Sequence, residues 1–268
     1  MNFSVAMCVY EGDNPLFFDK AIESILDNTL IPDEIILIVD GPISKKHEQI
    51  IDKYFKELTV YRFKENQGHG VARRKSLELC NNELVALMDA DDICLKDRFE
   101  KQINVFKNNS KLSIVGGQIE EFIDDVENII GKREVPLSDD NIKTYMKKRC
   151  PMNQVTVMFK KKDIIKAGNY LDWYSNEDYY LWIRMALNNL KFQNIDDTLV
   201  YVRVGKEAYQ RRGGKKYFLS EFRLQNYMLK KGIISVPRWI INVAERFVLQ
   251  IVMPNKLRGI IFQKLARR

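Results

Sequence analysis

Short apolar runs alternate with amphipathic segments through the first hundred residues of this 268-residue chain. The apolar runs have the length and residue types of β-strands and cover residues 3–9, 34–40, 60–63 and 84–88. The segments between them repeat apolar residues at helical spacing and cover residues 14–28, 44–55, 70–79 and 95–107. Four strand–helix units in succession predict an α/β fold built on a doubly wound sheet.

The rest of the chain is less regular. Strands are expected over residues 113–123, 154–160 and 199–204, and helices over residues 138–148 and 176–190. From residue 215 onward the pattern is helical only, with segments 215–231 and 237–252, a break at Pro254 and a last helix that runs to residue 268. The change of pattern predicts a domain over residues 1–214 and a helical extension over residues 215–268.

Charge is distributed unevenly between these two parts. The chain has a net charge of +7, but residues 206–268 hold 15 Lys/Arg against 3 Asp/Glu, and the remaining residues hold 28 against 33. The four cysteines form no CxxC pair, the N-terminus has no basic leader region, and no apolar run reaches the roughly 18 residues of a membrane span. These features predict a cytosolic protein with reduced thiols.

Acidic residues cluster where three of the predicted strands end. Asp89, Asp91 and Asp92 directly follow the fourth apolar run, and Glu11 and Asp40 follow the first two. Ligands of doubly wound sheets bind at the carboxyl ends of the strands. Carboxylates one residue apart suit Mg²⁺ or Mn²⁺, whose coordination shell substrate phosphates complete. The alternative is an Asx-type turn with Asp92 near a helix start.

Five segments resemble, in the same order, motifs of bacterial family-2 glycosyltransferases: FSVAMCVYEGD, PDEIILIVDGP, NQGHGVARR, ALMDADDI and NEDYYLWIRM. The resemblance extends from residue 1 to about residue 215 and is greatest to transferases that build capsular, exopolysaccharide or O-antigen repeat units. It implies an inverting enzyme with the GT-A fold, a Rossmann-like mixed sheet flanked by helices. Residues 1–110 would then form the nucleotide-binding half of the catalytic domain, and residues 111–214 the acceptor-binding half.

The resemblance also implies how a nucleotide-sugar donor is bound. Asp40 is similar to the aspartate that accepts a hydrogen bond from a uracil ring, which indicates a UDP-sugar. Gly68 and Arg73 resemble the glycine and arginine of a segment near the nucleotide, and a guanidinium suits phosphate or the acid cluster. The loop that lines the nucleoside pocket is matched by Val9, Tyr10 and Glu11.

The segment Asp89-Ala90-Asp91 resembles the DxD motif of these enzymes. Asp89 corresponds to the acid that faces the ribose, and Asp91 to the ligand of a divalent cation, Mn²⁺ or Mg²⁺. The metal would neutralise charge on the departing UDP. Asp92 is either a supporting group behind the metal ligand or a helix cap.

Inverting transfer needs a base that removes a proton from the acceptor hydroxyl. The resemblance assigns Asp178 as this base and Glu177 to acceptor orientation, although both residues could instead interact only with the helix dipole. Trp173 offers an aromatic face on which a sugar can stack. Related sequences often have His where this chain has Gln154. If that His contacts metal or diphosphate, Asn153 or Gln154 must make the contact here by hydrogen bonding, or the contact is lost.

The basic C-terminal helices carry an apolar stripe that includes Trp239 and Phe247. A basic amphipathic helix of this kind lies in a membrane interface or packs as a lid on the catalytic domain. Contact with the inner face of the cell membrane suits a lipid-linked saccharide acceptor. Arg211 and Arg212 then contact either the donor diphosphate or the phosphates of the acceptor lipid.

Two other classes of function fit parts of the sequence. A sugar-nucleotide nucleotidyltransferase would use a related sheet, but the first strand is not followed by the glycine-rich loop of such enzymes. A basic tail could grip nucleic acid, but here the charges are interleaved with aliphatic residues, which suit lipid better than bases. The sequence therefore predicts a metal-dependent glycosyltransferase that acts in cell-surface polysaccharide biosynthesis and binds no nucleic acid.

Overall fold

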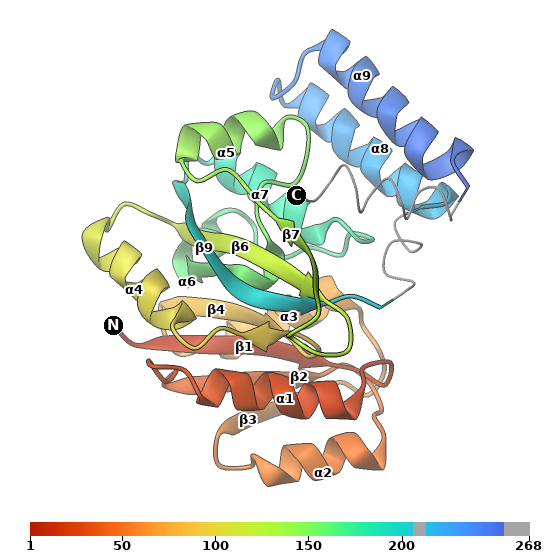
Figure 1. The fold of residues 1–268 in the computed structure, drawn as a ribbon. Helices are drawn as coiled ribbons and strands as arrows, with labels where there is room; N and C mark the ends of the chain where they lie inside the picture. The colour runs from red at the N-terminus through yellow and green to blue at the C-terminus, as the bar shows by residue number, and fades with distance from the viewer. Residues whose placement is uncertain (206–212, 255–268) are drawn as a thin grey trace.

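The computed structural model of the protein describes residues 1–205 and 213–254. Within these residues the strands form one mixed, nine-stranded sheet in the order β3-β2-β1-β4-β8-β6-β9-β5, with β7 beside β6, and helices cover both faces (Figure 1). The strands are β1 (Phe3–Val9), β2 (Glu34–Val39), β3 (Leu58–Arg62), β4 (Leu84–Asp89), β5 (Ile93–Cys94), β6 (Ile114–Phe122), β7 (Ile129–Arg133), β8 (Met158–Lys160) and β9 (Phe192–Arg203). The helices of this part are α1 (Pro15–Leu26), α2 (Lys45–Lys53), α3 (His69–Leu79), α4 (Arg98–Asn108), α5 (Asp139–Met146), α6 (Lys161–Lys166) and α7 (Glu177–Leu187).

The side chains of β2 show how the sheet separates two hydrophobic clusters. Ile35, Leu37 and Val39 pack in a cluster that also contains residues of α1, α2 and α4. Ile36 and Ile38 belong to the opposite cluster, to which α3, α5, α6 and α7 contribute. All five side chains are at most 2% exposed. The uninterrupted apolar run therefore reflects burial on both faces of the sheet.

The sheet is parallel on one side only. Strand β1 pairs in parallel with β2 and β4, and β2 with β3, as the repeated strand–helix pattern predicts. Strand β8, however, runs antiparallel to both of its neighbours, β4 and β6. The strand predicted over residues 154–160 is wrong in its first half, which is a 3₁₀ turn (Gln154–Thr156). Val155 and Thr156 are buried in this turn. The pattern of residues that suggested a strand here is therefore produced by a buried turn.

Several short elements were not predicted from the sequence. Strand β5 has two residues and pairs with β9, and β7 is held only as an antiparallel partner of β6. Helix α6 is six residues long. Strand β9 begins at Phe192 rather than at residue 199, because its polar first half is paired with β6. Elements of this size depend on a partner strand or helix that is distant in sequence, and local periodicity does not reveal them.

The C-terminal extension starts with two helices, α8 (Lys215–Lys230) and α9 (Val236–Phe247), and α9 continues into a π-helical turn (Val248–Val252). Leu224 and Met228 of α8 join the hydrophobic cluster that contains α7, so α8 packs on the α/β part of the chain. The helix predicted after Pro254 lies outside the described residues. Among the helices of the described residues, none is both long and apolar enough to cross a bilayer.

Candidate active site

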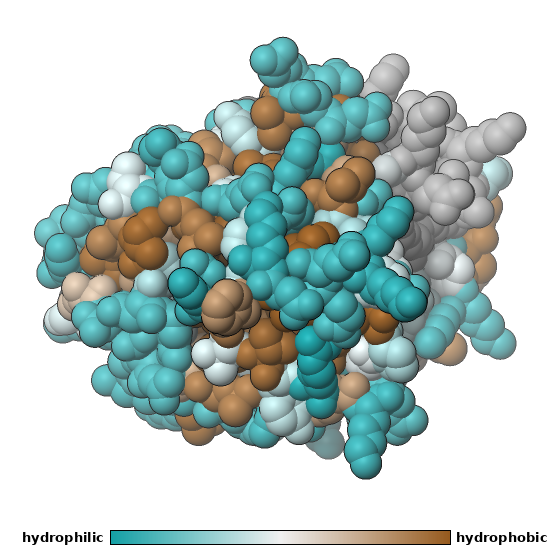
Figure 2. Space-filling model, turned by 90° about the horizontal axis from the view of Figure 1, so that it is seen from below, coloured by the Kyte–Doolittle hydropathy of each residue, from teal (hydrophilic) through white to brown (hydrophobic). Residues whose placement is uncertain are grey.

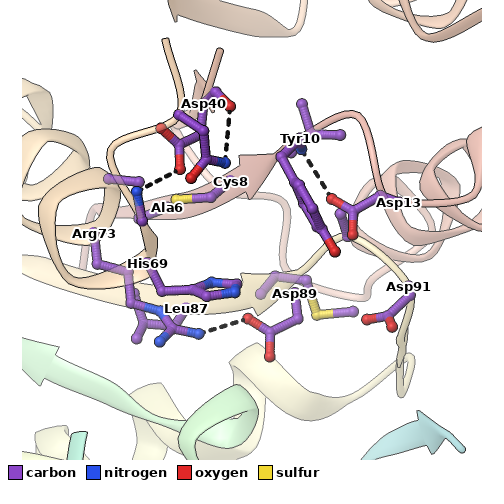
Figure 3. A pocket seen from close by; sticks show the side chains of 16 residues that line it. Ala6, Cys8, Tyr10, Asp13, Asp40, His69, Arg73, Leu87, Asp89 and Asp91 are labelled. Carbon is purple, nitrogen blue, oxygen red and sulfur yellow. Dashed lines mark hydrogen bonds and ion pairs between the residues drawn. The ribbon is translucent and has the colours of Figure 1, made fainter. Parts of the chain in front are cut away.

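The carboxyl ends of β1, β2 and β4 form one side of a pocket of about 350 Å³ (Figure 3). The strand register places Cys8 beside Asp89 and Val9 beside Val39, so the residues that follow these strands meet at one edge of the sheet. Glu11, which was expected here, is exposed and does not line the pocket. The other residues predicted to bind the donor all line it: Val9, Tyr10, Asp40, Gly68, Arg73, Asp89, Ala90 and Asp91.

Asp40 organises the loop that enters α3. Its Oδ1 accepts a hydrogen bond from the main-chain N–H of Gln67 (2.7 Å), and its Oδ2 accepts one from that of Gly68 (3.0 Å). The next residue, Gly41, has a φ of +93°, and a Cβ there would lie 2.8 Å from the main-chain nitrogen of Asn66. Only glycine fits this close approach without strain. The carboxylate is thus fixed at the pocket wall, where its remaining lone pairs can accept a further hydrogen bond.

Arg73 connects the end of β4 with the start of α7. Its Nη2 donates to Asp89 Oδ1 at 3.1 Å, and its Nη1 donates to Glu177 Oε1 at 2.5 Å. Burial alone would lower the pKa of Arg73, but the two carboxylates outweigh it and raise that pKa. Glu177 is itself buried, and in this structure its carboxylate is paired with Arg73. The contact expected between Glu177 and an acceptor remains a prediction.

Arg203, at the end of β9, supports the loop after Asp89 and was missed in the sequence. Its main-chain N–H donates to Asp92 Oδ1 (2.8 Å), and its Nε donates to the carbonyl oxygen of Asp91 (3.1 Å). The guanidinium lies between the rings of Phe17 and Phe122, at 3.8 and 4.4 Å from their centroids. The sequence offered no signal for this contact beyond a basic residue at a strand end.

Asp92 is the buried member of the acid cluster. Burial first, and then the charges of Asp91 and Asp89, raise its pKa well above the usual value for an aspartate. Helix α4 begins only at Arg98, with Asp97 as its N-cap residue. Asp92 therefore does not cap α4, and its role as a supporting group behind Asp91 remains a prediction.

Asp13 is a further carboxylate of the pocket that was not predicted from the sequence. Its Oδ2 accepts a hydrogen bond from the main-chain N–H of Tyr10 at 3.0 Å, and the side chain faces the same cavity (Figure 3). Burial raises its pKa to about 7, with smaller contributions from Asp91 and Asp89. Its place in the EGD segment, two residues after Glu11, was the available signal.

Asp178, the candidate base, occupies the first turn of α7. Its Oδ1 accepts from the main-chain N–H of Tyr179 (2.6 Å), and the thiol of Cys150 lies 3.7 Å from its Oδ2. Burial and the neighbouring charge of Glu177 raise its pKa to about 6. Such a carboxyl group is ionised at neutral pH and is also a stronger base than an ordinary aspartate.

The residues expected on the acceptor side lie outside the pocket lining. Asn153 donates from Nδ2 to a main-chain oxygen at 2.8 Å, and Gln154 donates from Nε2 to the hydroxyl of Tyr170 at 3.0 Å. The amide oxygen of each is buried and has no hydrogen-bond partner among the described residues. Trp173 packs against Tyr180 with ring centroids 4.3 Å apart, so one of its faces is already covered.

The acid cluster fits a divalent cation that is shared with a ligand. Asp89 and Asp91 offer carboxylate oxygens, the donor type that Mg²⁺ and Mn²⁺ prefer. The part of the chain that the structure describes contains no group of three or more His, Cys, Asp or Glu placed to hold a metal by itself. An ion here would therefore need further oxygen ligands, such as phosphate oxygens. Arg211 and Arg212, expected near phosphates, lie outside the described residues.

This mixed sheet, with a carboxylate-lined pocket at the ends of its parallel strands, is the GT-A fold of glycosyltransferases. The chain belongs to glycosyltransferase family 2: residues 4–168 match the family model described as "Glycosyl transferase family 2". TarS from S. aureus, solved in complex with UDP-GlcNAc, has a similar fold, with a TM-score of 0.65 and 16% identity over 92% of this chain and 73% of that one.

Two relatives match almost along their full length. The UDP-Gal:alpha-D-GlcNAc-diphosphoundecaprenol beta-1,3-galactosyltransferase of Escherichia coli is 36% identical over 99% of this chain and 97% of the relative. The amylovoran biosynthesis glycosyltransferase AmsE of Erwinia amylovora is 31% identical over 98% of both chains. The protein is therefore a glycosyltransferase, similar to the bacterial enzymes of capsular and O-antigen type, as its motifs predict.

Proposed function

We propose that the protein transfers a sugar, with inversion, from a UDP-sugar to a hydroxyl group of a lipid-linked saccharide during cell-surface polysaccharide synthesis. One observation carries the proposal. Asp40, Asp89 and Asp91 line a single pocket, and the Arg73–Glu177 ion pair connects that pocket to the helix that bears Asp178. The relative from Escherichia coli, whose name specifies a UDP-sugar donor and a diphosphoundecaprenol-linked acceptor, supports these substrate classes.

The donor is bound at the carboxyl ends of β1, β2 and β4. Asp40 accepts the N–H of the uracil ring, and Tyr10 covers the nucleoside. Asp91, assisted by Asp89, holds Mn²⁺ or Mg²⁺. When bound, the ion supplies Lewis-acid stabilisation of the leaving diphosphate. Arg73 keeps Asp89 oriented toward the pocket. Its own buried charge is compensated, because it pairs with both Asp89 and Glu177.

The acceptor hydroxyl approaches from the side of α7. Asp178 accepts its proton as the hydroxyl oxygen attacks the anomeric carbon, and the pKa of about 6 keeps Asp178 ionised at neutral pH. Glu177 fixes the first turn of α7 through its ion pair with Arg73. Because a lipid-linked acceptor is embedded in a bilayer, the reaction takes place at the inner face of the cell membrane.

The proposal is tested by incubating the protein with a panel of nucleotide-sugars and Mn²⁺ while free nucleotide is measured. We expect slow release of UDP from a UDP-sugar and a rise in melting temperature with UDP plus Mn²⁺. Asp91→Ala should abolish both effects. Asp52→Ala, which removes an exposed carboxylate on α2, should change neither. Release of pyrophosphate instead of UDP, or no binding across the panel, would contradict the proposal.

A further inference from the structure

Helix α9 turns its polar residues toward the protein. Asn242, only 1% exposed, donates from Nδ2 to the carbonyl oxygen of Lys147 (2.9 Å) and to Gln225 Oε1 (2.8 Å). Arg246, one turn further on, pairs with Glu221 of α8 through Nε at 2.6 Å. The side by which α9 is attached is therefore hydrogen-bonded and charged.

The opposite side of α9 is apolar and exposed. In a water-facing helix the apolar stripe normally packs on the core and the polar stripe faces solvent. Here Trp239 packs against the core, but most of the other apolar residues of the helix face solvent. Val236 and Ile240 are 57% and 54% exposed, and Val248 and Val252 in the last turns are 49% and 61% exposed. Between Arg238 and Glu245 this outward side carries no charged residue.

This concentration of exposed aliphatic residues differs from other parts of the surface. In the view of Figure 2, apolar residues form several small groups that are separated by hydrophilic ones. Single exposed apolar side chains are normal, but a contiguous apolar face marks a contact surface. In Figure 1, α9 is the helix farthest from the sheet and lies beside α8 at the periphery of the molecule. Its outer side is therefore accessible to a large partner.

The net charge of the helical extension that carries this face indicates which partner the face meets. Residues 213–254 hold seven Lys/Arg against two Asp/Glu, and one residue of each kind is used in the pair between Arg246 and Glu221, which leaves six against one. A second copy of the chain would bring two positively charged surfaces together. An anionic bilayer attracts such a surface, at a distance of about a Debye length, and accepts aliphatic side chains below its headgroups.

We propose that the outward face of α9 and its π-helical turn, formed by Val236, Ile240, Val248, Ile251 and Val252, is a docking surface for an anionic lipid bilayer. The inward hydrogen bonds of Asn242 and Arg246 hold the helix so that this face stays free. The inference deepens the proposed function by naming the surface that meets the membrane of a lipid-linked acceptor. It does not require that any donor or metal be bound.

The test is co-sedimentation of the full chain with vesicles, without donor or metal. We expect binding to vesicles of phosphatidylcholine mixed with phosphatidylglycerol and much weaker binding to phosphatidylcholine alone. Ile240→Glu and Val248→Glu should each weaken binding by about tenfold or more, because each removes an inserted aliphatic group and adds a repelled charge. Phe55→Glu is the matched control, since Phe55 is 68% exposed but lies beyond α2, and it should not change binding.

Two further measurements test whether the C-terminal residues bind the membrane instead, or whether a second copy of the chain covers this face. If Ile240→Glu leaves vesicle binding unchanged while removal of residues 255–268 abolishes it, the proposal is overturned in favour of the C-terminal residues. If the wild type is a dimer that Ile240→Glu converts to a monomer and no vesicles are bound, a second copy covers the face instead. Donor hydrolysis by Ile240→Glu should match that of the wild type, so loss of docking is distinguishable from loss of the proposed function.

Discussion

Replacement of the candidate base, Asp178→Asn, should make the protein more stable and less active. Burial and the charge of Glu177 raise the pKa of Asp178 from 3.8 to about 6. The folded state therefore binds the proton more tightly than the unfolded state does, and stability falls as the pH rises from about 4 to about 6. Above that range the ionised carboxylate destabilises the fold. A neutral amide of the same shape removes this cost.

The size of the gain follows from the shift. About two pKa units at about 1.4 kcal/mol each correspond to roughly 3 kcal/mol. Asp178 is partly exposed, so solvent screens the charge and we expect about half of this, between 1 and 2 kcal/mol. Asparagine keeps an oxygen for the N–H of Tyr179, but the thiol of Cys150 loses its acceptor, Oδ2.

The assay is urea unfolding of wild type and variant at pH 7.5 and at pH 4.5, without donor or metal. The variant should gain its 1 to 2 kcal/mol at the higher pH and lose most of that gain at the lower one. The rate of sugar transfer to the acceptor should fall by about 10²–10⁴-fold, the usual contribution of a general base. An equal change in stability at both pH values would refute the electrostatic reasoning. Retained transfer would exclude Asp178 as the base.

Two further substitutions test the groups around the pocket. Glu177→Gln should move the acidic limb of the pH–rate profile to lower pH, because the charge of Glu177 raises the pKa of Asp178; an unchanged limb would show that burial alone sets this pKa. Arg203→Ala should weaken Mn²⁺ binding, followed by calorimetry with UDP, and should destabilise the fold by about 2 kcal/mol through the lost hydrogen bond and ring contacts. Arg203→Lys, which keeps the charge, should recover part of both losses, and wild-type Mn²⁺ affinity in Arg203→Ala would show that the loop of Asp91 holds its own geometry.

The first half of the fold was predictable from the sequence because each of its elements has a recognisable hydrophobic pattern of its own. Strands β1, β2 and β4 are buried on both faces and read as apolar runs, the edge strand β3 is a shorter run that is buried mainly at Leu58, and helices α1 to α4 show one apolar side each. The site followed from the same reading, since parallel strands end at one edge of the sheet. Asp40, Asp89 and Asp91 were therefore expected together and line one pocket.

The second half was less predictable because its short elements depend on distant partners. Strands β5 and β7 exist as partners of β9 and β6. The support of the acid cluster is equally non-local: Arg203 is more than a hundred residues from Asp91, and Arg73 is about as far from Glu177. No local pattern marks such contacts, since each depends on how the sheet brings two segments together.

The sequence by itself determined the order of strands and helices in the first half, the acids at the strand ends and the amphipathic character of the last helices. Tertiary structure decided which acids are paired, which have a pKa raised by burial, and which side of α9 faces outward. The physical reason is that periodicity fixes which residues share a face of an element, whereas the partner of that face is set by long-range packing. Asn242 and Arg246 show this, because their hydrogen bonds to the body leave the apolar side of α9 exposed.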